Sequence, residues 1–149
     1  MDTKSFSVRI PLNAQAIILD VELHIPVIDG NSEKIISIKT KALVDTGANS
    51  SCISKRLASA CSLRPVSALK MISAHGMSIA QVYEVSISLP NDVVFPSLSV
   101  VEVEGSRLFD VIIGMDILSK SDFVFSSDNE KSCFSLRIPS KNELIDFSR

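Results

Sequence analysis

One short stretch of the sequence places an acid, a hydroxyl and a glycine directly after an apolar run, as Ala42-Leu43-Val44 followed by Asp45-Thr46-Gly47. The run is typical of a strand, and the glycine lets the backbone turn sharply and approach the carboxylate closely. Such a strand presents its acid to a cleft. Two carboxyl groups that share one proton can take a proton from water and protonate a carbonyl oxygen, which is the chemistry of peptide-bond hydrolysis without a metal.

The sequence contains this triplet once, because Asp20, Asp92 and Asp110 have no similar context. A single chain therefore supplies only half of a carboxyl pair. We expect an active enzyme to consist of two copies related by a two-fold axis, each of which contributes its Asp45. The two carboxyls would titrate as a unit, so neither apparent pKa would belong to one residue.

Two long predicted strands position the acid. Hydrophobic residues alternate over residues 16–28, turn residues follow at 29–32, and residues 34–44 return as a strand that leads into Asp45. An earlier alternating segment, residues 6–12, has a proline near its end and is predicted to be an edge strand. Rigid strands suit a catalytic group better than a mobile loop does.

The rest of the chain shows many short strand patterns separated by turn signals. Ser54 is a suitable N-cap for a helix over residues 55–61, and Gly76 is expected near the tip of a hairpin over residues 69–85. Further strands are predicted over residues 85–89, 93–103, 108–113, 123–125 and 133–138, and a second short helix over 117–120. We therefore predict an all-β fold, a closed barrel with one or two short helices, as a single domain over residues 1–140 with a tail over 141–149.

Residues 42–50 resemble the active-site signature of aspartic peptidases, in which an apolar pair precedes Asp-Thr-Gly-Ala. A second stretch, Val111-Ile112-Ile113-Gly114-Met115-Asp116-Ile117-Leu118, resembles the turn into a short helix that those folds place behind the active-site loop. The order and separation of the two stretches are similar to those of the retropepsins, the retroviral-type, single-domain aspartic peptidases. The resemblance covers roughly residues 34–138 and implies a closed acid-protease barrel that is half of a two-fold dimer.

The resemblance implies a role for each residue of the first motif. Asp45 would activate the water, the Thr46 hydroxyl would bond across the two-fold axis, and Gly47 would bring its N–H to the carboxylate. Ala48 is small and leaves room for a peptide backbone, so Ala48 and Asn49 are expected to bind substrate.

The hairpin tip at Ala74-His75-Gly76-Met77 corresponds to the flap that closes over a polypeptide substrate in this family. Gly76 would then allow the flap to move and to approach the peptide closely. Without the family resemblance the same tip is only turn chemistry. The candidate walls of the substrate pockets, which the sequence does not separate from core positions, are Leu43, Ile72, Ile79, Ile112 and Ile113.

The sequence departs from the viral retropepsins at two positions. Viral members typically carry Arg at the position of Met115, paired with an acid at the position of Asn49, and both are replaced here. Losing both partners together leaves no buried charge unpaired. The chain therefore resembles the soluble cellular and bacterial relatives more than the viral enzymes. Asp116 precedes the predicted second helix, so we expect it to cap that helix and not to act in catalysis.

The composition excludes several classes of function. The chain has 149 residues, is 46% hydrophobic and carries a net charge of -2, which predicts one folded domain without a basic surface for nucleic acid. No apolar stretch approaches the roughly 18 residues of a membrane helix. Cys52, Cys61 and Cys133 lack the spacing of a metal site, so neither a metal nor another cofactor is expected. Free thiols and the absence of an apolar leader predict a cytoplasmic protein.

Three functions fit these residues. The first is a homodimeric aspartic endopeptidase that binds an extended polypeptide as an added strand and prefers apolar side chains. The second is a catalytically weak retropepsin-like dimerisation or peptide-binding module, which the replaced Met115 and Asn49 keep open and the intact Asp45-Thr46-Gly47 opposes. The third is a monomeric all-β protein in which Asp45 is only a turn acid.

Overall fold

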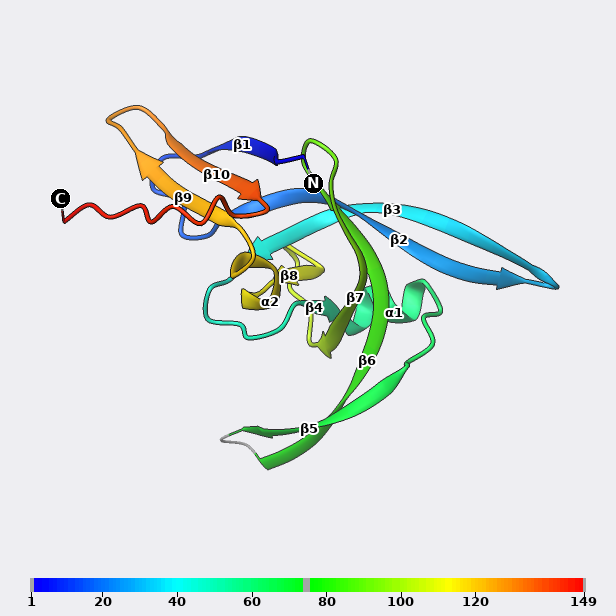
Figure 1. Ribbon diagram of the computed structural model, residues 1–149. Coiled ribbons are helices and arrows are strands. Elements are labelled where there is room, and N and C mark those ends of the chain that lie inside the picture. Colours follow the sequence, from blue (N-terminus) through cyan, green and yellow to red (C-terminus); the bar gives the residue numbers. More distant parts are fainter. Residues whose placement is uncertain (1, 74–75, 149) are drawn as a thin grey trace.

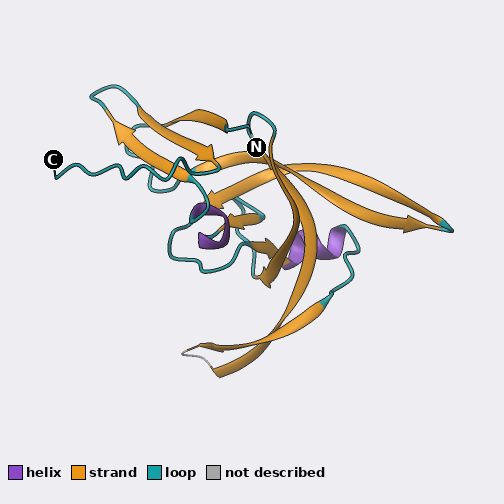
Figure 2. Ribbon diagram, in the orientation of Figure 1, coloured by secondary structure: helices purple, strands orange, loops and turns teal. Residues whose placement is uncertain are grey.

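The computed structural model describes residues 2–73 and 76–148 of the chain. Within these residues the chain forms ten strands and two short helices (Figure 2). In chain order they are β1 (Lys4–Ile10), β2 (Ile18–Asp29), β3 (Ser32–Val44), β4 (Cys52–Ser54), α1 (Lys55–Ala60), β5 (Ser67–Ser73), β6 (Gly76–Leu89), β7 (Val93–Val103), β8 (Val111–Ile113), α2 (Met115–Leu118), β9 (Asp122–Ser127) and β10 (Ser132–Ile138).

Six of the strands form a closed barrel in the order β2-β3-β8-β4-β7-β6, and a pairing between β2 and β6 closes it. His24 lies at this seam, where one ring nitrogen is 2.9 Å from the Ser37 hydroxyl of β3 and the other is 2.7 Å from the Ser88 hydroxyl of β6. β5 extends the sheet beyond β6. The closed all-β barrel with two short helices confirms the fold predicted from the sequence.

The β2–β3 hairpin projects from the barrel as a long arm (Figure 1). The candidate acid follows the last residue of β3, at the end opposite the hairpin tip. The tip turns at Gly30, whose φ of 65° is a conformation that glycine adopts without strain. One face of β2 is buried in the barrel core because its hydrophobic residues alternate with polar ones. These buried residues are Leu19, Val21, Leu23 and Ile25.

A separate three-stranded sheet has the order β1-β10-β9 and joins the two ends of the chain. β1 lies at its edge, as its sequence predicted. Phe6 of β1 and Phe134 of β10 pack in the common hydrophobic core, with ring centroids 6.2 Å apart. Residues 141–148 follow β10 without a helix or strand.

Two strand predictions need correction. Residues 85–89 are not a separate strand, because β6 runs unbroken over 14 residues and its partner β7 takes up a bulge at Pro96 and Ser97 instead. Proline cannot donate to the ladder, so the irregularity falls there. The strand predicted over residues 108–113 is confined to β8, because the Asp110 side chain turns towards polar partners and Leu108 is exposed.

Candidate active site

The Asp45-Thr46-Gly47 triplet lies on the loop that leaves β3. The Asp45 N–H donates to the Ile113 carbonyl at 3.0 Å, and the Gly47 N–H donates to the Asp45 carboxylate at 2.8 Å. Asp45 is half-buried, whereas Thr46 and Gly47 are exposed. The backbone therefore fixes the orientation of the carboxylate and leaves the triplet accessible at the surface.

The second sequence motif forms the support behind this loop, as the resemblance implied. β8 pairs in parallel with the end of β3, and the Met115 N–H donates to the Ala48 carbonyl at 2.8 Å. Gly114 packs directly against the loop, because a Cβ atom added there would lie 2.7 Å from the carbonyl carbon of Ser50. Only glycine allows this approach without displacing the backbone of the loop.

Ser51 and Asp116 connect the loop to α2. The Ser51 N–H donates to Asp116 Oδ2 at 3.0 Å, and the Ser51 hydroxyl donates to Asp116 Oδ1 at 2.8 Å. The Gly114 N–H donates to the same hydroxyl oxygen at 3.1 Å. Sequence reasoning missed Ser51, although one signal was present: a polar residue at the buried start of a strand needs a partner.

The capping role predicted for Asp116 is therefore only part of its function. The N-cap of α2 is Gly114, which has no side chain to cap with. Asp116 Oδ1 accepts from the Ile117 N–H at 3.0 Å, but both of its oxygens also accept from Ser51. Asp116 thus satisfies one helix N–H and holds the loop at the same time.

The two positions that differ from the viral pattern have separate environments. Asn49 is exposed on the loop, and Met115 is half-buried against the core. The loop is held instead by Ser51 and Asp116, at positions two residues after Asn49 and one after Met115. The fold thus supports the loop without the viral ion pair.

Cys52 lies beside the loop as a buried thiol. Its Sγ donates to the Ser50 carbonyl at 3.3 Å. Burial raises the pKa of the Cys52 thiol, and the nearby carboxylates of Asp116 and Asp45 raise this pKa further. The thiol therefore stays protonated at neutral pH and is a poor nucleophile.

The predicted flap is the hairpin of β5 and β6, which extends away from the barrel at the bottom of Figure 1. Ala74 and His75 lie outside the described residues. Gly76 has a φ of 112°, which favours glycine, and Met77 is exposed. Of the candidate pocket residues, Ile72 and Ile79 are exposed on the hairpin, Leu43 and Ile112 are half-buried, and Ile113 is fully buried in the core.

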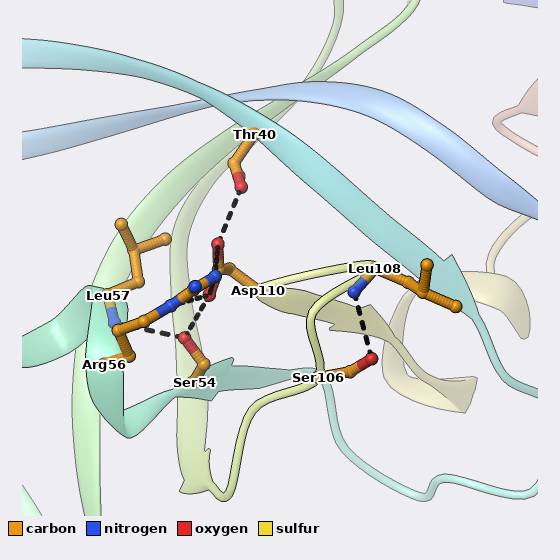
Figure 3. A network of polar contacts seen from close by, with 7 residues as sticks. All are labelled: Thr40, Ser54, Arg56, Leu57, Ser106, Leu108 and Asp110. Carbon is orange, nitrogen blue, oxygen red and sulfur yellow. Dashed lines mark hydrogen bonds and ion pairs between the residues drawn. The ribbon is translucent and has the colours of Figure 1, made fainter.

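A second acid, Asp110, lies in a polar network that braces the barrel (Figure 3). Its carboxylate accepts from the Ser54 hydroxyl at 2.6 Å and from Arg56 Nη2 at 2.8 and 2.9 Å, and Thr40 Oγ1 lies 3.4 Å away. Burial alone would raise the pKa of Asp110, but the bonds from Ser54 and Arg56 outweigh it and lower this pKa below its ordinary value. Asp110 therefore ties together β3, β4 and α1 and is not available as a second catalytic acid.

Two further observations concern metal binding and membrane-spanning helices. Among residues 2–73 and 76–148, no group of three or more His, Cys, Asp and Glu side chains is placed to hold a metal ion. In the same part of the chain no helix has the length and apolar character needed to cross a membrane.

The barrel and the supported Asp-Thr-Gly loop define a retropepsin-like aspartic protease fold. The sequence family described as gag-polyprotein putative aspartyl protease matches residues 34–120, more than half of the chain, and the chain belongs to this family. No curated protein matches the sequence.

Solved structures of retropepsin-like proteins are similar to this chain, and the first of those below shares its fold. A retropepsin-like aspartic protease from Rickettsia conorii is 17% identical with a TM-score of 0.55, covering 91% of this chain and 95% of that one. The protease of Simian Foamy Virus (mac) is 17% identical with a TM-score of 0.47, covering 69% and 92%. The retroviral protease-like domain of Ddi1 from Leishmania major is 20% identical with a TM-score of 0.43, covering 85% and 98%.

Proposed function

We propose that this chain is an aspartic endopeptidase that hydrolyses peptide bonds with water activated between the Asp45 carboxyls of two copies. The observation that carries the proposal is the Asp45 carboxylate itself, which is oriented by the Gly47 N–H at 2.8 Å and reaches the surface on an otherwise well-supported loop. The same bond occurs in ordinary Asx turns, so the match of residues 34–120 to the aspartyl protease family adds the support for a catalytic role.

In the proposed reaction the two carboxyls have different roles, since one acts as a base and the other as an acid. Like charges at close range cannot both ionise, so the pair holds one proton at the working pH. The ionised Asp45 takes a proton from water, while the protonated Asp45 of the second copy donates to the carbonyl oxygen of the peptide. Thr46 is exposed beside Asp45, and we assign its hydroxyl to a bond between the two loops.

The substrate would be an extended polypeptide under the β5–β6 hairpin. Main-chain hydrogen bonds would hold it as an added strand, and Ala48 and Asn49 would contact its backbone. The arms of the hairpin present the apolar side chains Ile72, Met77 and Ile79 to solvent. We therefore expect a preference for apolar residues on both sides of the cleaved bond.

The decisive experiment compares wild type with Asp45→Asn on a proteome-derived peptide library from mildly acidic to neutral pH. Asp20→Asn is the matched control, because Asp20 is an exposed acid on β2, paired with Lys41. Cuts made by wild type and Asp20→Asn but not by Asp45→Asn would support the proposal. Equal cutting by all three proteins would show that Asp45 is not the catalytic acid.

The alternative is a retropepsin-like dimerisation or peptide-binding module with little hydrolysis. The replacement of the viral Arg and acid by Met115 and Asn49 is the observation that favours it. A folded dimer that binds peptides but cuts none of them at any pH would establish this alternative. The cytoplasmic location and the division into a domain over residues 1–140 and a tail stay predictions from the sequence.

A further inference from the structure

A pocket beside the Asp110 network has polar walls. It lies between α1 and the loop that follows β7, and its volume is about 410 Å³. Its lining includes Lys55 and Arg56 of α1 and residues 104–107 of the loop, and each described residue that lines it is charged, carries a hydroxyl or is glycine. The volume falls within the range of small-molecule sites, but the walls of such sites are usually apolar. This α1 pocket is therefore suited to a hydrophilic ligand.

Cations outnumber anions in the α1 pocket. Lys55, Arg56 and Arg107 line it together with one carboxylate, that of Glu104. Lys55 and Arg107 are exposed, and in the part of the chain that the structure describes neither takes part in an ion pair. Because the whole chain carries a net charge of -2, this concentration of cations is local. Cations that line a concave surface without protein partners attract anions to it.

Asp110 holds the Arg56 guanidinium in place (Figure 3). Arg56 Nη2 donates to the two Asp110 oxygens at 2.8 and 2.9 Å, and Arg56 Nε donates to Oδ1 at 3.3 Å. Within the described residues these bonds use Nε and Nη2 and leave Nη1 with its two N–H groups, on a side chain that is 66% exposed. A guanidinium that is fixed in this way loses little conformational entropy when it binds an oxyanion.

The loop supplies a further donor and packs closely on α1. The Ser106 hydroxyl oxygen accepts from the Leu108 N–H at 3.1 Å, so the hydroxyl proton stays available to a ligand (Figure 3). A Cβ atom added to Gly105 would lie 2.8 Å from the Cβ of Ser54, the N-cap of α1. Glycine therefore lets the loop approach the start of α1, which brings the two walls of the pocket together.

We propose that the α1 pocket binds a small phosphorylated molecule, with the phosphate group on Lys55, Arg56 and Arg107. A phosphate monoester carries a charge of about -1.5 to -2 at neutral pH and has three acceptor oxygens. One phosphate can therefore accept from all three side chains, in short charge-assisted bonds. A carboxylate carries less charge and has one oxygen fewer, so it should bind more weakly. The inference does not depend on Asp45 or on the proposed function.

The rest of the ligand should carry hydroxyl groups. The Glu104 carboxylate only accepts hydrogen bonds, so it would repel a phosphate but bind a hydroxyl. No apolar side chain of the described residues lines the pocket, so an acyl chain would gain nothing by entering it. Phosphate esters of sugars and other polyols combine a doubly charged group with hydroxyls, and they are the class of ligand that these walls match.

The first test measures the dissociation constant of glycerol 3-phosphate by isothermal titration calorimetry at low ionic strength. Wild type is compared with Lys55→Gln and Arg107→Gln, which remove exposed charges outside the ion pairs of the fold. We expect each change to raise the dissociation constant about 10- to 100-fold, because a bond to a charged group is lost. Lys131→Gln is the matched control, an exposed lysine between β9 and β10, and should match wild type.

The second test identifies the class of ligand with four probes: glycerol 3-phosphate, inorganic phosphate, acetate and glycerol. Wild type should bind glycerol 3-phosphate most tightly, inorganic phosphate next, acetate more weakly and glycerol not measurably. Glu104→Gln should remove the preference for glycerol 3-phosphate over inorganic phosphate, because Glu104 is the acceptor that we assign to the hydroxyl groups. Equal affinities for the two phosphates in wild type would overturn that assignment.

The outcomes separate this inference from the proposed function. Asp45→Asn should bind glycerol 3-phosphate as wild type does, because Asp45 does not line the α1 pocket. Phosphate binding that is lost in Lys55→Gln and Arg107→Gln but kept in Asp45→Asn would support the site, whether or not the chain cuts peptides. A wild type that binds neither phosphate, wild-type affinity in both lysine and arginine variants, or acetate bound as tightly as phosphate would overturn it.

Discussion

Ser51 and Asp116 are 65 positions apart in the sequence and are joined by two hydrogen bonds, both donated by Ser51. A carboxylate only accepts, and Ser51 is fully buried and offers both a backbone and a side-chain donor. The hydroxyl oxygen also accepts from Gly114. One serine side chain therefore connects the loop that carries Asp45 to Gly114 and to α2.

Removing this connection should reduce catalysis more than it reduces folding. We expect Ser51→Ala and Asp116→Ala each to lower kcat about 10- to 100-fold, because a loop displacement of about 1 Å is enough for such a loss. Each should also cost about 1–3 kcal/mol in the free energy of unfolding, since a partner is left buried and unpaired. Steady-state kinetics and urea unfolding give the two values, with the exposed Ser59→Ala as control. A kcat equal to that of wild type in Ser51→Ala would contradict this role.

Gly114→Ala tests the contact between the second motif and the loop. The added Cβ would lie 2.7 Å from the Ser50 carbonyl carbon and 2.9 Å from the Ala48 carbonyl oxygen, so the backbone must move. We expect a loss of about 1–3 kcal/mol in stability and nearly complete loss of cleavage. In the control Gly30→Ala, at a hairpin tip with a φ of 65°, backbone strain of about 1 kcal/mol should lower stability without changing kcat.

Asp110 and Arg56 form an ion pair, but they should contribute unequally to the free energy of unfolding. The Asp110 side chain is 16% exposed and accepts from several groups, whereas the Arg56 side chain is 66% exposed. We expect Asp110→Ala to lower the free energy of unfolding by about 1–3 kcal/mol, because the Ser54 hydroxyl loses its acceptor. Arg56→Ala should cost less than about 1 kcal/mol, as exposed ion pairs do. Chemical denaturation measures both, and equal losses would contradict the asymmetry.

Asp122 makes the start of β9 sensitive to acid. Its pKa is lowered from 3.8 to about 2, first by the bond from the Ser140 hydroxyl and then by Lys141 N–H and Arg137. Because the folded pKa lies below the unfolded one, Asp122 stabilises the fold fully above about pH 4, and this contribution is lost as the pH falls towards about 2.

The melting temperatures of wild type and Asp122→Asn should therefore differ most above pH 4 and converge near pH 2. Thermal melts followed by circular dichroism across this range provide the measurement. Asp20→Asn, which removes an exposed ion pair with Lys41, should lie close to wild type throughout. A constant gap between wild type and Asp122→Asn at every pH would show that the charge of Asp122 is not involved.

Local patterns in the sequence predicted much of this fold correctly. Alternation placed the ends of β1, β2 and β3 to within two residues, and Ser54 caps α1 by accepting from the Leu57 N–H as expected. These features depend on neighbours in the chain, so the sequence contains their determinants. The support of the Asp45 loop by the second motif came from the family resemblance.

The features that were not predicted depend on residues far apart in the sequence. The double bond from Ser51 to Asp116, the Arg56–Asp110 bridge and the edge position of β9 all follow from how the sheets close. Hydrophobic periodicity reports which face of a strand is buried, but not which strand lies next to it. Asp116 was assigned only to its own helix for this reason.

The pairing of β1 with β10 has a consequence for synthesis of the protein. Lys4 pairs with Ile138 and Ile10 with Ser132, so β1 has no partner strand until β10 has been translated. At ordinary translation rates this interval is on the order of ten seconds. During that time Phe6, which packs against Phe134 in the folded protein, has not yet met its partner ring. The three-stranded sheet therefore forms only after β10 has been synthesised.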